Sequence, residues 1–381
     1  MVFATFFNLK LLNYNGIKFI ILATLFAALA SGVRVVGCYL PFLTIIFYFL
    51  NYNKKKHKLS EIKFLFIYLF LFFIFLFLSW PYLWENPLLN FINSFKLIGN
   101  LDYPMHTLYL GEFVNAKYIP WHYFFVWFFI STPPFFLFLI LLGIYLFMKK
   151  FLQNFLSIDP KNNVLLWKND IERVELFIFL LIIIPIFTTI LFGSTLYNGW
   201  RHLYFIYPFM IFISIKGILF LYDFSKNHLR KIFNLLIMFQ ILFLLNFLVS
   251  NHPIQFVYFN FLSKNLIQNN FSYDYWGVAN KVTLEKLLND KDIKKPIKIS
   301  TASYTDLNKT KFIMTNQQRK NLLILGTENK NADFIFTNYY YNYDPKTEKK
   351  FQVPNNYHSI TKLEVNGLII NEVFKRKGNN N

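Results

Sequence analysis

Cysteine is nearly absent from this chain, which has one such residue, Cys38, among 381. A disulfide framework is therefore excluded, and so is a zinc site that needs paired cysteines. The seven histidines lie far apart, without the spacing of metal ligands, so we predict no metal centre built from His and Cys side chains. A divalent cation held by carboxylates stays an open alternative, and no other cofactor is predicted.

Charged residues are the second scarce class. They make up 15% of the chain, with 20 Asp and Glu against 39 Lys and Arg. Apolar residues take their place, because 55% of the chain is hydrophobic, 21% is aromatic and the mean hydropathy is +0.36. This composition is typical of an integral membrane protein, and we predict no nucleic-acid partner.

The apolar runs predict a polytopic α-helical membrane protein with about seven spans, since each crossing needs roughly 20 apolar residues. Every second loop between the predicted spans lies on the same side of the membrane. The short loops on one side are rich in Lys, above all 51–63, and such loops are retained in the cytoplasm. We therefore expect a transmembrane region, 1–250, in the cytoplasmic (inner) membrane and an extracytoplasmic domain, 251–381. The predicted spans are 19–33, 35–50, 64–84, 124–147, 176–192, 203–222 and 232–250.

The C-terminal segment has the pattern of an α/β domain. Residues 278–288 have helical periodicity. Segments 296–303, 332–340 and 367–376 are rich in β-branched and aromatic residues and are bounded by turn formers, so each predicts a strand. About 130 residues are enough for one hydrophobic core.

The predicted outer loop, 80–123, contains a candidate interfacial helix. Apolar residues recur at three and four positions through "LLNFINSFKLIG", which predicts an amphipathic helix on the outer leaflet. Tryptophans flank it at positions 80, 84, 121 and 127, where they would anchor the chain at the membrane surface.

The stretch "YNGWRHLYFIYP" (197–208) places Arg201 and His202 directly before an apolar run. A charge at the bilayer centre is costly, by about 3 kcal/mol on lenient scales, so we expect Arg201 at a water-facing rim. Two roles fit that position. The guanidinium can bind a phosphate with two parallel hydrogen bonds, or it can anchor the helix end at the headgroups.

Four pieces of sequence carry a resemblance to a known family. They are "WPYLWENP", "YLGEFVNAKYIPWHYFFVWFFISTPP" (109–134), "YNGWRHLYFIYP", and "HPIQFVYFN" with the "DYWG" that follows it (252–277). In the order of these four pieces and in their spacing relative to the predicted spans, the sequence resembles the bacterial C-type glycosyltransferase superfamily. The similar branch is the polytopic one that includes protein O-mannosyltransferases and aminoarabinose transferases.

The resemblance implies a sugar donor carried on a polyprenyl phosphate and transfer on the outer face of the membrane. It leaves the acceptor unidentified, because members of the family glycosylate proteins, lipids and surface polysaccharides. It implies a donor-phosphate site at Arg201, His202 and Arg34, and a lipid or sugar path along Tyr197, Tyr204, Tyr207 and Trp121.

The chain departs from the family in its acidic residues. Family members carry a catalytic Asp or Glu in the first external loop, whereas the first acidic residue here is Glu61. We therefore expect a chain that lacks the family's N-terminal part, either shortened or completed by a complementary N-terminal chain. Alternatively Glu85, Asp102 or Glu112 supplies the base. Asp102 is the best placed of these, although an Asp before Pro104 can also simply cap a turn.

Two other classes of function stay open. A transporter would carry ionisable groups near the middle of the membrane, and the predicted spans contain few besides Lys216. A non-catalytic or truncated membrane partner would keep the lipid-phosphate site and depend on another chain for the base.

Overall fold

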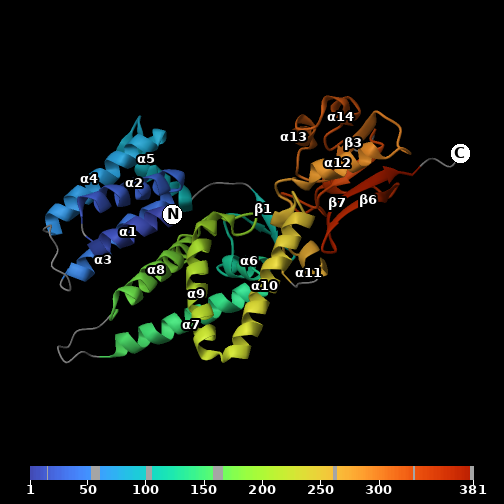
Figure 1. Ribbon diagram of the computed structural model, residues 1–381. Coiled ribbons are helices and arrows are strands. Elements are labelled where there is room, and N and C mark those ends of the chain that lie inside the picture. Colours follow the sequence, from blue (N-terminus) through green and yellow to red (C-terminus); the bar gives the residue numbers. More distant parts are fainter. Residues whose placement is uncertain are drawn as a thin grey trace. The chain divides into compact units, whose positions relative to one another are not determined.

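The computed structural model describes residues 1–14, 16–52, 61–99, 105–157, 166–260, 264–328 and 331–377 (Figure 1). The chain divides into two compact units, and each is assembled from segments that are far apart in the sequence. Unit 1 comprises Met1–Leu101, Phe136–Ser194 and His202–Ser225. Unit 2 comprises Asp102–Phe135, Thr195–Arg201 and Lys226–Asn381.

In the described residues of unit 1, the secondary-structure elements are all helices or 3-10 turns. Its first helix, α1, precedes every span that the sequence predicted. The α-helices are α1 (Val2–Tyr14), α2 (Ile17–Val33), α3 (Tyr39–Tyr52), α4 (Glu61–Ser79), α5 (Pro87–Gly99), α7 (Pro134–Leu156), α8 (Asp170–Leu191) and α9 (Tyr207–Phe224), and the 3-10 turns are η1 (Val35–Cys38), η2 (Pro81–Leu83) and η3 (Arg201–Ile206).

Several polar side chains inside these apolar helices find hydrogen-bond partners within the protein. Thr24 Oγ1 donates to the carbonyl of Ile20 at 2.7 Å, one helical turn back. The buried Asn8 of α1 accepts a hydrogen bond from the hydroxyl of Tyr68 in α4 at 2.6 Å. Such internal pairing is required where no water is present to compensate a polar group.

The predicted break between the first two apolar runs is confirmed. Helix α2 ends at Val33, Arg34 is extended, and the chain turns through η1 into α3. Gly37 makes this turn possible, because a Cβ there would lie 2.6 Å from the backbone of Ala30 and Ser31. Only glycine lets the turn pack so closely against α2.

A charge pair joins two of the apolar helices. Lys216 of α9 forms an ion pair and hydrogen bond with Glu175 of α8, and both side chains are largely buried. Lys216 was noted from sequence, whereas its partner, one residue outside the predicted span 176–192, was missed. Pairing lowers the cost of holding either charge among apolar helices.

Four helices are long and apolar enough to cross a membrane, which supports a multi-pass membrane protein. Shorter apolar helices occupy Ile17–Val33, Val35–Leu50 and Lys63–Ser79, so the full count of seven spans stays a prediction. The four long helices are Pro134–Leu156, Asp170–Leu191, Arg201–Phe224 and His228–Ser250.

The single span predicted at 124–147 is wrong. Helix α6 (Tyr123–Ser131) ends inside the predicted span, Thr132 is extended, and a separate helix, α7, begins at Pro134. Two consecutive prolines explain the break, since each lacks an N–H group and the first disfavours helical backbone in Thr132. The indole of Trp200 also donates to the hydroxyl of Ser131 at 2.9 Å, which ties the end of α6 into unit 2.

Unit 2 combines a hairpin, further helices and the C-terminal sheet. The hairpin strands pair antiparallel through a turn at Leu110 and Gly111, both with positive φ. Its elements are β1 (His106–Tyr109), β2 (Glu112–Asn115), α6, α10 (Asn227–Ser250), η4 (Gln255–Val257), α11 (Lys264–Gln268), α12 (Ala279–Asn289), β3 (Ile297–Thr301), α13 (Leu307–Phe312), α14 (Asn316–Lys320), β4 (Leu322–Ile324), β5 (Phe334–Thr337), η5 (Lys349–Phe351), β6 (Tyr357–Val365) and β7 (Leu368–Arg376).

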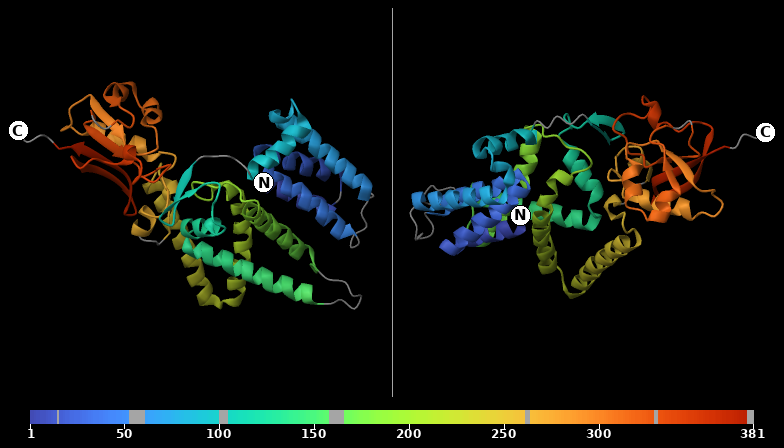
Figure 2. Two further views of the ribbon diagram at one scale, coloured as in Figure 1. Left: turned by 180° about the vertical axis from the view of Figure 1, so that it is seen from behind. Right: turned by 90° about the horizontal axis from the view of Figure 1, so that it is seen from above.

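The C-terminal sheet, drawn in orange to red in Figure 2, is mixed. Its strand order is β4-β3-β5-β7-β6. Strand β3 runs parallel to both β4 and β5, while β7 runs antiparallel to both β5 and β6. Helix α12 contributes Leu284, Leu287 and Leu288 to a buried cluster with side chains of β3, β5 and β7. This cluster packs on one face of the sheet, and Ala302, Ile335 and Tyr357 form a second buried cluster on it.

The predicted helix at 278–288 and the predicted strands are confirmed as α12, β3, β5 and β7. Strands β4 and β6 were missed. Strand β6 had a readable signal, because Asn366 and Gly367 form the two-residue turn to β7 with φ of 50° and 77°.

The amphipathic segment in the predicted outer loop is helical, as expected, and forms α5. Its apolar side chains lie on the surface, with Leu88 80% and Ile92 51% exposed, while Ser94 is buried. An exposed apolar face of this kind suits the interface of a membrane.

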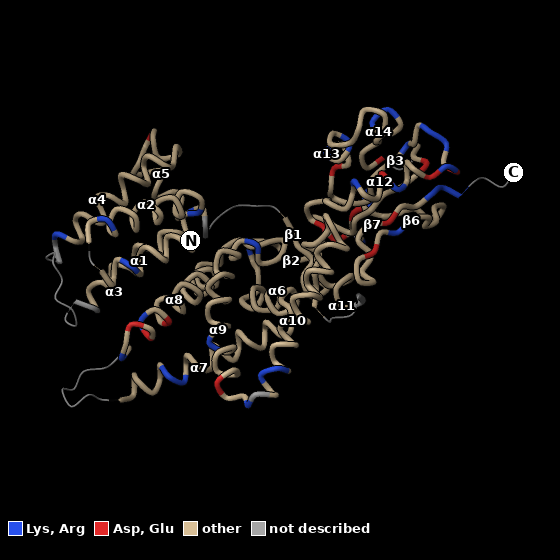
Figure 3. Tube along the Cα trace, viewed as in Figure 1, with Lys and Arg blue, Asp and Glu red and all other residues tan. Residues whose placement is uncertain are grey.

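Basic residues mark several helix ends. Figure 3 shows Lys and Arg near the end of α7 and at the turn between α9 and α10, where Lys149, Lys150, Lys226 and Arg230 lie. This placement agrees with the pattern used to predict the cytoplasmic side. The side itself stays a prediction.

Candidate functional site

The segment Thr195–Arg201 is fastened to unit 2 on both sides of a tight turn. Before the turn, the N–H of Leu196 donates to the carbonyl of Ala116 at 3.1 Å. Asn198 and Gly199 have φ of 57° and 74°, a conformation that Asn and Gly adopt most readily. Trp200 then bonds to Ser131, and Arg201 follows at the start of η3. The local sequence therefore fixes the position of the Arg201 backbone.

Aromatic rings surround the guanidinium of Arg201. Its central carbon lies 4.7 Å from the ring centroid of Tyr197, 5.4 Å from that of Tyr275 and 5.1 Å from that of Trp276. Each distance is within the range of a cation–π interaction. Within the described part of the chain, Arg201 forms no ion pair with a carboxylate. The positive charge is therefore held in place by rings and stays available to an anion.

A pocket of about 630 Å³ opens beside this arginine, and we call it the Arg201 pocket. Its lining is rich in tyrosine and contains two cations, Arg201 and Lys309. The lining residues are Met105, Tyr197, Asn198, Arg201, Tyr275, Trp276, Asn280, Tyr304, Thr305, Asp306, Lys309, Thr310 and Tyr340. All of them belong to unit 2.

The floor of the Arg201 pocket is tied together by hydrogen bonds. The hydroxyl of the buried Tyr340 donates to the side-chain oxygen of Asn198 at 3.1 Å, which links the turn before Arg201 to the segment after β5. The amide of Asn280, at the start of α12, lies 3.5 Å from the hydroxyl of Thr305. Segments from four parts of the chain are thereby held around one space.

The lining carboxylate, Asp306, is exposed and already has a structural role. Its side chain accepts a hydrogen bond from the N–H of Asn308 at 2.8 Å and so caps α13. Lys309 lies one turn along the same helix. With Arg201 and Lys309 against Asp306, the pocket lining is formally +1, which favours an anionic ligand.

A second carboxylate, Asp274, lies directly before Tyr275 and is fully buried. Burial raises its pKa from 3.8 to about 7, although N–H groups at the start of α12 partly offset this by hydrogen bonding to the charged form. One of these bonds runs from the N–H of Val278 at 3.1 Å. Asp274 therefore positions the Tyr275–Trp276 segment and does not face the pocket.

The predicted site residues fall in different places. Tyr197 lies against Arg201, and its predicted role in a lipid or sugar path stays a prediction. Trp121 and Tyr204 are 67% and 52% exposed and do not line the Arg201 pocket, and Tyr207 packs on Phe136 at a centroid distance of 5.8 Å. Asp102 lies outside the described residues.

Arg34 and His202 belong to unit 1. A guanidinium nitrogen of Arg34 donates to the backbone carbonyl of His202 at 2.6 Å, so Arg34 fixes the chain directly after Arg201. Arg34 also lines a mainly apolar cavity of about 340 Å³ together with Val36, Phe205 and Pro208. The predicted phosphate role of these two residues stays a prediction.

Tyr275 and Trp276 were missed as site residues, although "DYWG" had been noted as a family-like motif. Nothing in the local sequence connects them with Arg201, which is more than 70 residues earlier. Lys309, Tyr304 and Tyr340 were missed for the same reason. In the described ranges, no three His, Cys, Asp or Glu side chains gather so as to hold a metal ion.

Comparison of this chain with protein-family models, with curated proteins and with solved structures finds no match.

Proposed function

We propose that this protein is a membrane glycosyltransferase that takes a sugar from a polyprenyl-phosphate donor. The observation that carries the proposal is the Arg201 guanidinium, held by aromatic rings at the edge of a pocket and at the start of a helix long enough to cross a membrane. A lipid-linked phosphate needs a cation at headgroup depth, which is where the start of such a helix would lie.

The lining of the Arg201 pocket suits both the phosphate and the sugar of such a donor. Arg201 binds the phosphate through paired hydrogen bonds, and Lys309 adds a second positive charge. The faces of Tyr275, Trp276 and Tyr304 offer apolar surfaces on which a sugar ring can pack. Asn198 and Asn280 add side-chain amides that can hydrogen-bond its hydroxyls.

In the transfer step, an acceptor hydroxyl oxygen forms a bond to the anomeric carbon, and the bond from that carbon to the phosphate oxygen breaks. The proton of the hydroxyl passes to a base, and polyprenyl phosphate leaves. Arg201 stabilises the charge that develops on the departing phosphate. The base remains the sequence-based expectation of Asp102 or a residue of a complementary chain.

The test is direct binding of undecaprenyl phosphate, with and without a linked hexose, to the purified full chain in nanodiscs. Arg201→Lys keeps the charge and loses the paired geometry, so we expect affinity to weaken by about 1–3 kcal/mol, and Arg201→Ala to lose more. Arg319→Ala is the matched control, because Arg319 also lies over an aromatic ring, Phe312, outside the Arg201 pocket.

Equal binding by the wild type and both Arg201 variants would refute the proposal and leave Arg201 as an interfacial anchor. The same samples separate an enzyme from a non-catalytic membrane partner. An enzyme releases undecaprenyl phosphate when an acceptor is supplied, whereas a partner binds the donor without turnover.

A further inference from the structure

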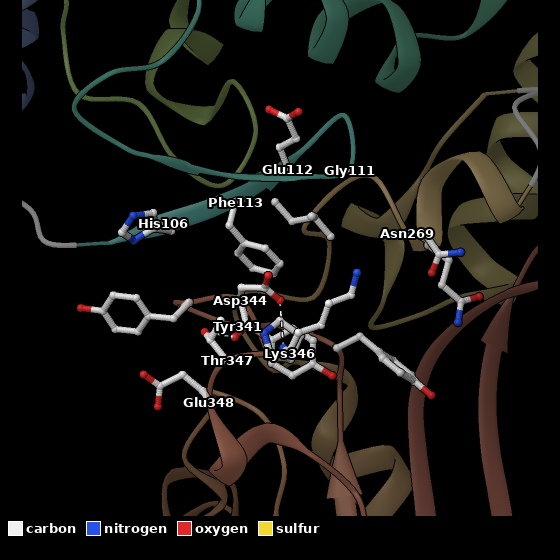
Figure 4. Close-up of a pocket in the computed structure, with 15 residues that line it drawn as sticks. His106, Gly111, Glu112, Phe113, Asn269, Tyr341, Asp344, Lys346, Thr347 and Glu348 are labelled. Carbon is white, nitrogen blue, oxygen red and sulfur yellow. Dashed lines mark hydrogen bonds between the residues drawn. The ribbon is translucent and has the colours of Figure 1, made fainter.

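A second and larger pocket, of about 810 Å³, lies in unit 2 (Figure 4). The β1–β2 hairpin, α11 and the segment after β5 build it. We call it the tyrosine-loop pocket, after Tyr339, Tyr341 and Tyr343. Its lining residues are His106, Leu108, Gly111, Glu112, Phe113, Gln268, Asn269, Tyr339, Tyr341, Tyr343, Asp344, Pro345, Lys346, Thr347 and Glu348.

The two pockets of unit 2 share a wall. In the run "YYYNY" after β5, Tyr339, Tyr341 and Tyr343 line the tyrosine-loop pocket, whereas Tyr340 lines the Arg201 pocket. The start of β1 repeats this division, because Met105, directly before the strand, lines the Arg201 pocket, whereas His106, its first residue, lines the tyrosine-loop pocket. The N–H of His106 donates to the carbonyl of Asn342 at 3.2 Å and joins the two parts of the wall. Ligands in the two pockets would therefore be neighbours.

The shape of the tyrosine-loop pocket is fixed by strong local constraints. Tyr339 has a φ of 54°, which is rare for a bulky residue and costs about 1 kcal/mol or more. Its hydroxyl bonds to the buried carboxylate of Glu372, which holds the side chain in place. In the hairpin, a Cβ on Gly111 would lie 2.7 Å from the side chain of Asn270, so the hairpin turn packs directly against the segment that follows α11.

The charge of this lining is opposite to that of the chain. Glu112, Asp344 and Glu348 stand against one cation, Lys346, a formal balance of 1 − 3 = −2 in a protein of net charge +19. A phosphate or other anion is therefore disfavoured here. The carboxylates also do not converge, since Figure 4 shows Glu112 and Glu348 at opposite ends of the cluster.

The remaining lining residues suit a ligand with many hydroxyl groups. Tyr343, 36% exposed, offers a ring whose centroid lies 5.3 Å from that of His106, and Phe113 points from the hairpin towards Asp344 and Lys346 (Figure 4). Aromatic faces pack on the C–H surfaces of sugar rings. Carboxylates and the amides of Gln268 and Asn269 hydrogen-bond hydroxyl or amino groups.

We propose that the tyrosine-loop pocket binds an oligosaccharide that is neutral or carries amino groups. Its shared wall with the Arg201 pocket makes this saccharide the acceptor of the transfer, a role that rests on the proposed function. Saccharide binding itself does not depend on that function, because it is carried by the lining alone.

The experiment measures binding of soluble oligosaccharides to the purified full chain by calorimetry. The probes are tri- to hexasaccharides of glucose, mannose, galactose, N-acetylglucosamine and glucosamine, with oligogalacturonate as the acidic comparison. We expect at least one neutral or amino-sugar probe to bind and oligogalacturonate to be excluded. Tyr343→Ala and Glu348→Gln should each weaken binding about fivefold to tenfold, from loss of one ring contact or one hydrogen-bond acceptor.

Tyr118→Ala is the matched control, because this tyrosine is 73% exposed in unit 2 and lines neither pocket. No binding of any neutral or amino-sugar probe would overturn the proposal. So would unchanged affinity in both pocket variants, or oligogalacturonate binding as tightly as the other probes. Arg201→Ala tests the donor site separately, and it should leave oligosaccharide affinity unchanged even if the proposed function fails.

Discussion

Helices α7 and α9 approach each other so closely at Gly143 and Gly217 that neither position has room for a methyl group. A Cβ on Gly143 would collide with the carbonyl oxygen of Ile213 and lie 2.9 Å from its carbonyl carbon. A Cβ on Gly217 would lie 2.7 Å from the carbonyl oxygen of Leu139. Small residues allow such backbone contact between membrane helices. We therefore predict that Gly143→Ala destabilises unit 1.

The magnitude follows from two opposing effects. Overpacking costs about 1–3 kcal/mol, and here the upper half applies because the obstacle is backbone that cannot rotate away. Alanine regains about 1 kcal/mol through its better helix propensity. The net expectation is a loss of about 1–2 kcal/mol. Gly32→Ala in α2 is the control, since its Cβ would meet Ser79 Oγ at an ordinary 3.6 Å.

Thermal unfolding in one detergent, followed by intrinsic fluorescence, measures this prediction. The transition of Gly143→Ala should fall below that of the wild type, and Gly32→Ala should match or exceed the wild type. If Gly143→Ala unfolded at the same temperature as the wild type and Gly32→Ala, the close approach of α7 and α9 would be refuted.

The remaining predictions concern pH and topology. The folded-state pKa of Asp274, about 7, is raised above its usual value of 3.8. The contribution of Asp274 to the free energy of unfolding is therefore fully present below pH 4 and is lost as pH rises through 7. The loss is about 4 kcal/mol at most. Asp274→Asn keeps a side-chain oxygen that can accept the hydrogen bond from the Val278 N–H, and it carries no charge. The melting temperature of this variant should therefore rise relative to that of the wild type between pH 4 and pH 8, and a constant difference would contradict the prediction. For topology, a reporter fused after Ser250 should be active on the periplasmic side and one within 51–63 on the cytoplasmic side, and the reverse pair would refute the assignment.

The sequence alone determined the class of the protein and many of its elements. Apolar runs long enough for membrane helices follow directly from composition, because local hydropathy needs no knowledge of neighbours. The same is true of α12, β3, β5 and β7, whose periodicity and turn residues are local. Arg201 was also singled out from sequence as a candidate, because an arginine directly before an apolar run is conspicuous. The break at Thr132 was readable from its two prolines, yet it was missed because the apolar run continued across it.

Only the tertiary structure decided what surrounds Arg201. Tyr275 and Trp276 come from a segment far along the chain, and no local pattern indicates that they meet this arginine. The division of Tyr340 from Tyr339 and Tyr341 between two pockets likewise depends on the packing of β1 and the loop after β5. The physical reason is that periodicity shows which side of an element is buried, whereas the partner on that side is chosen by long-range packing of the whole unit.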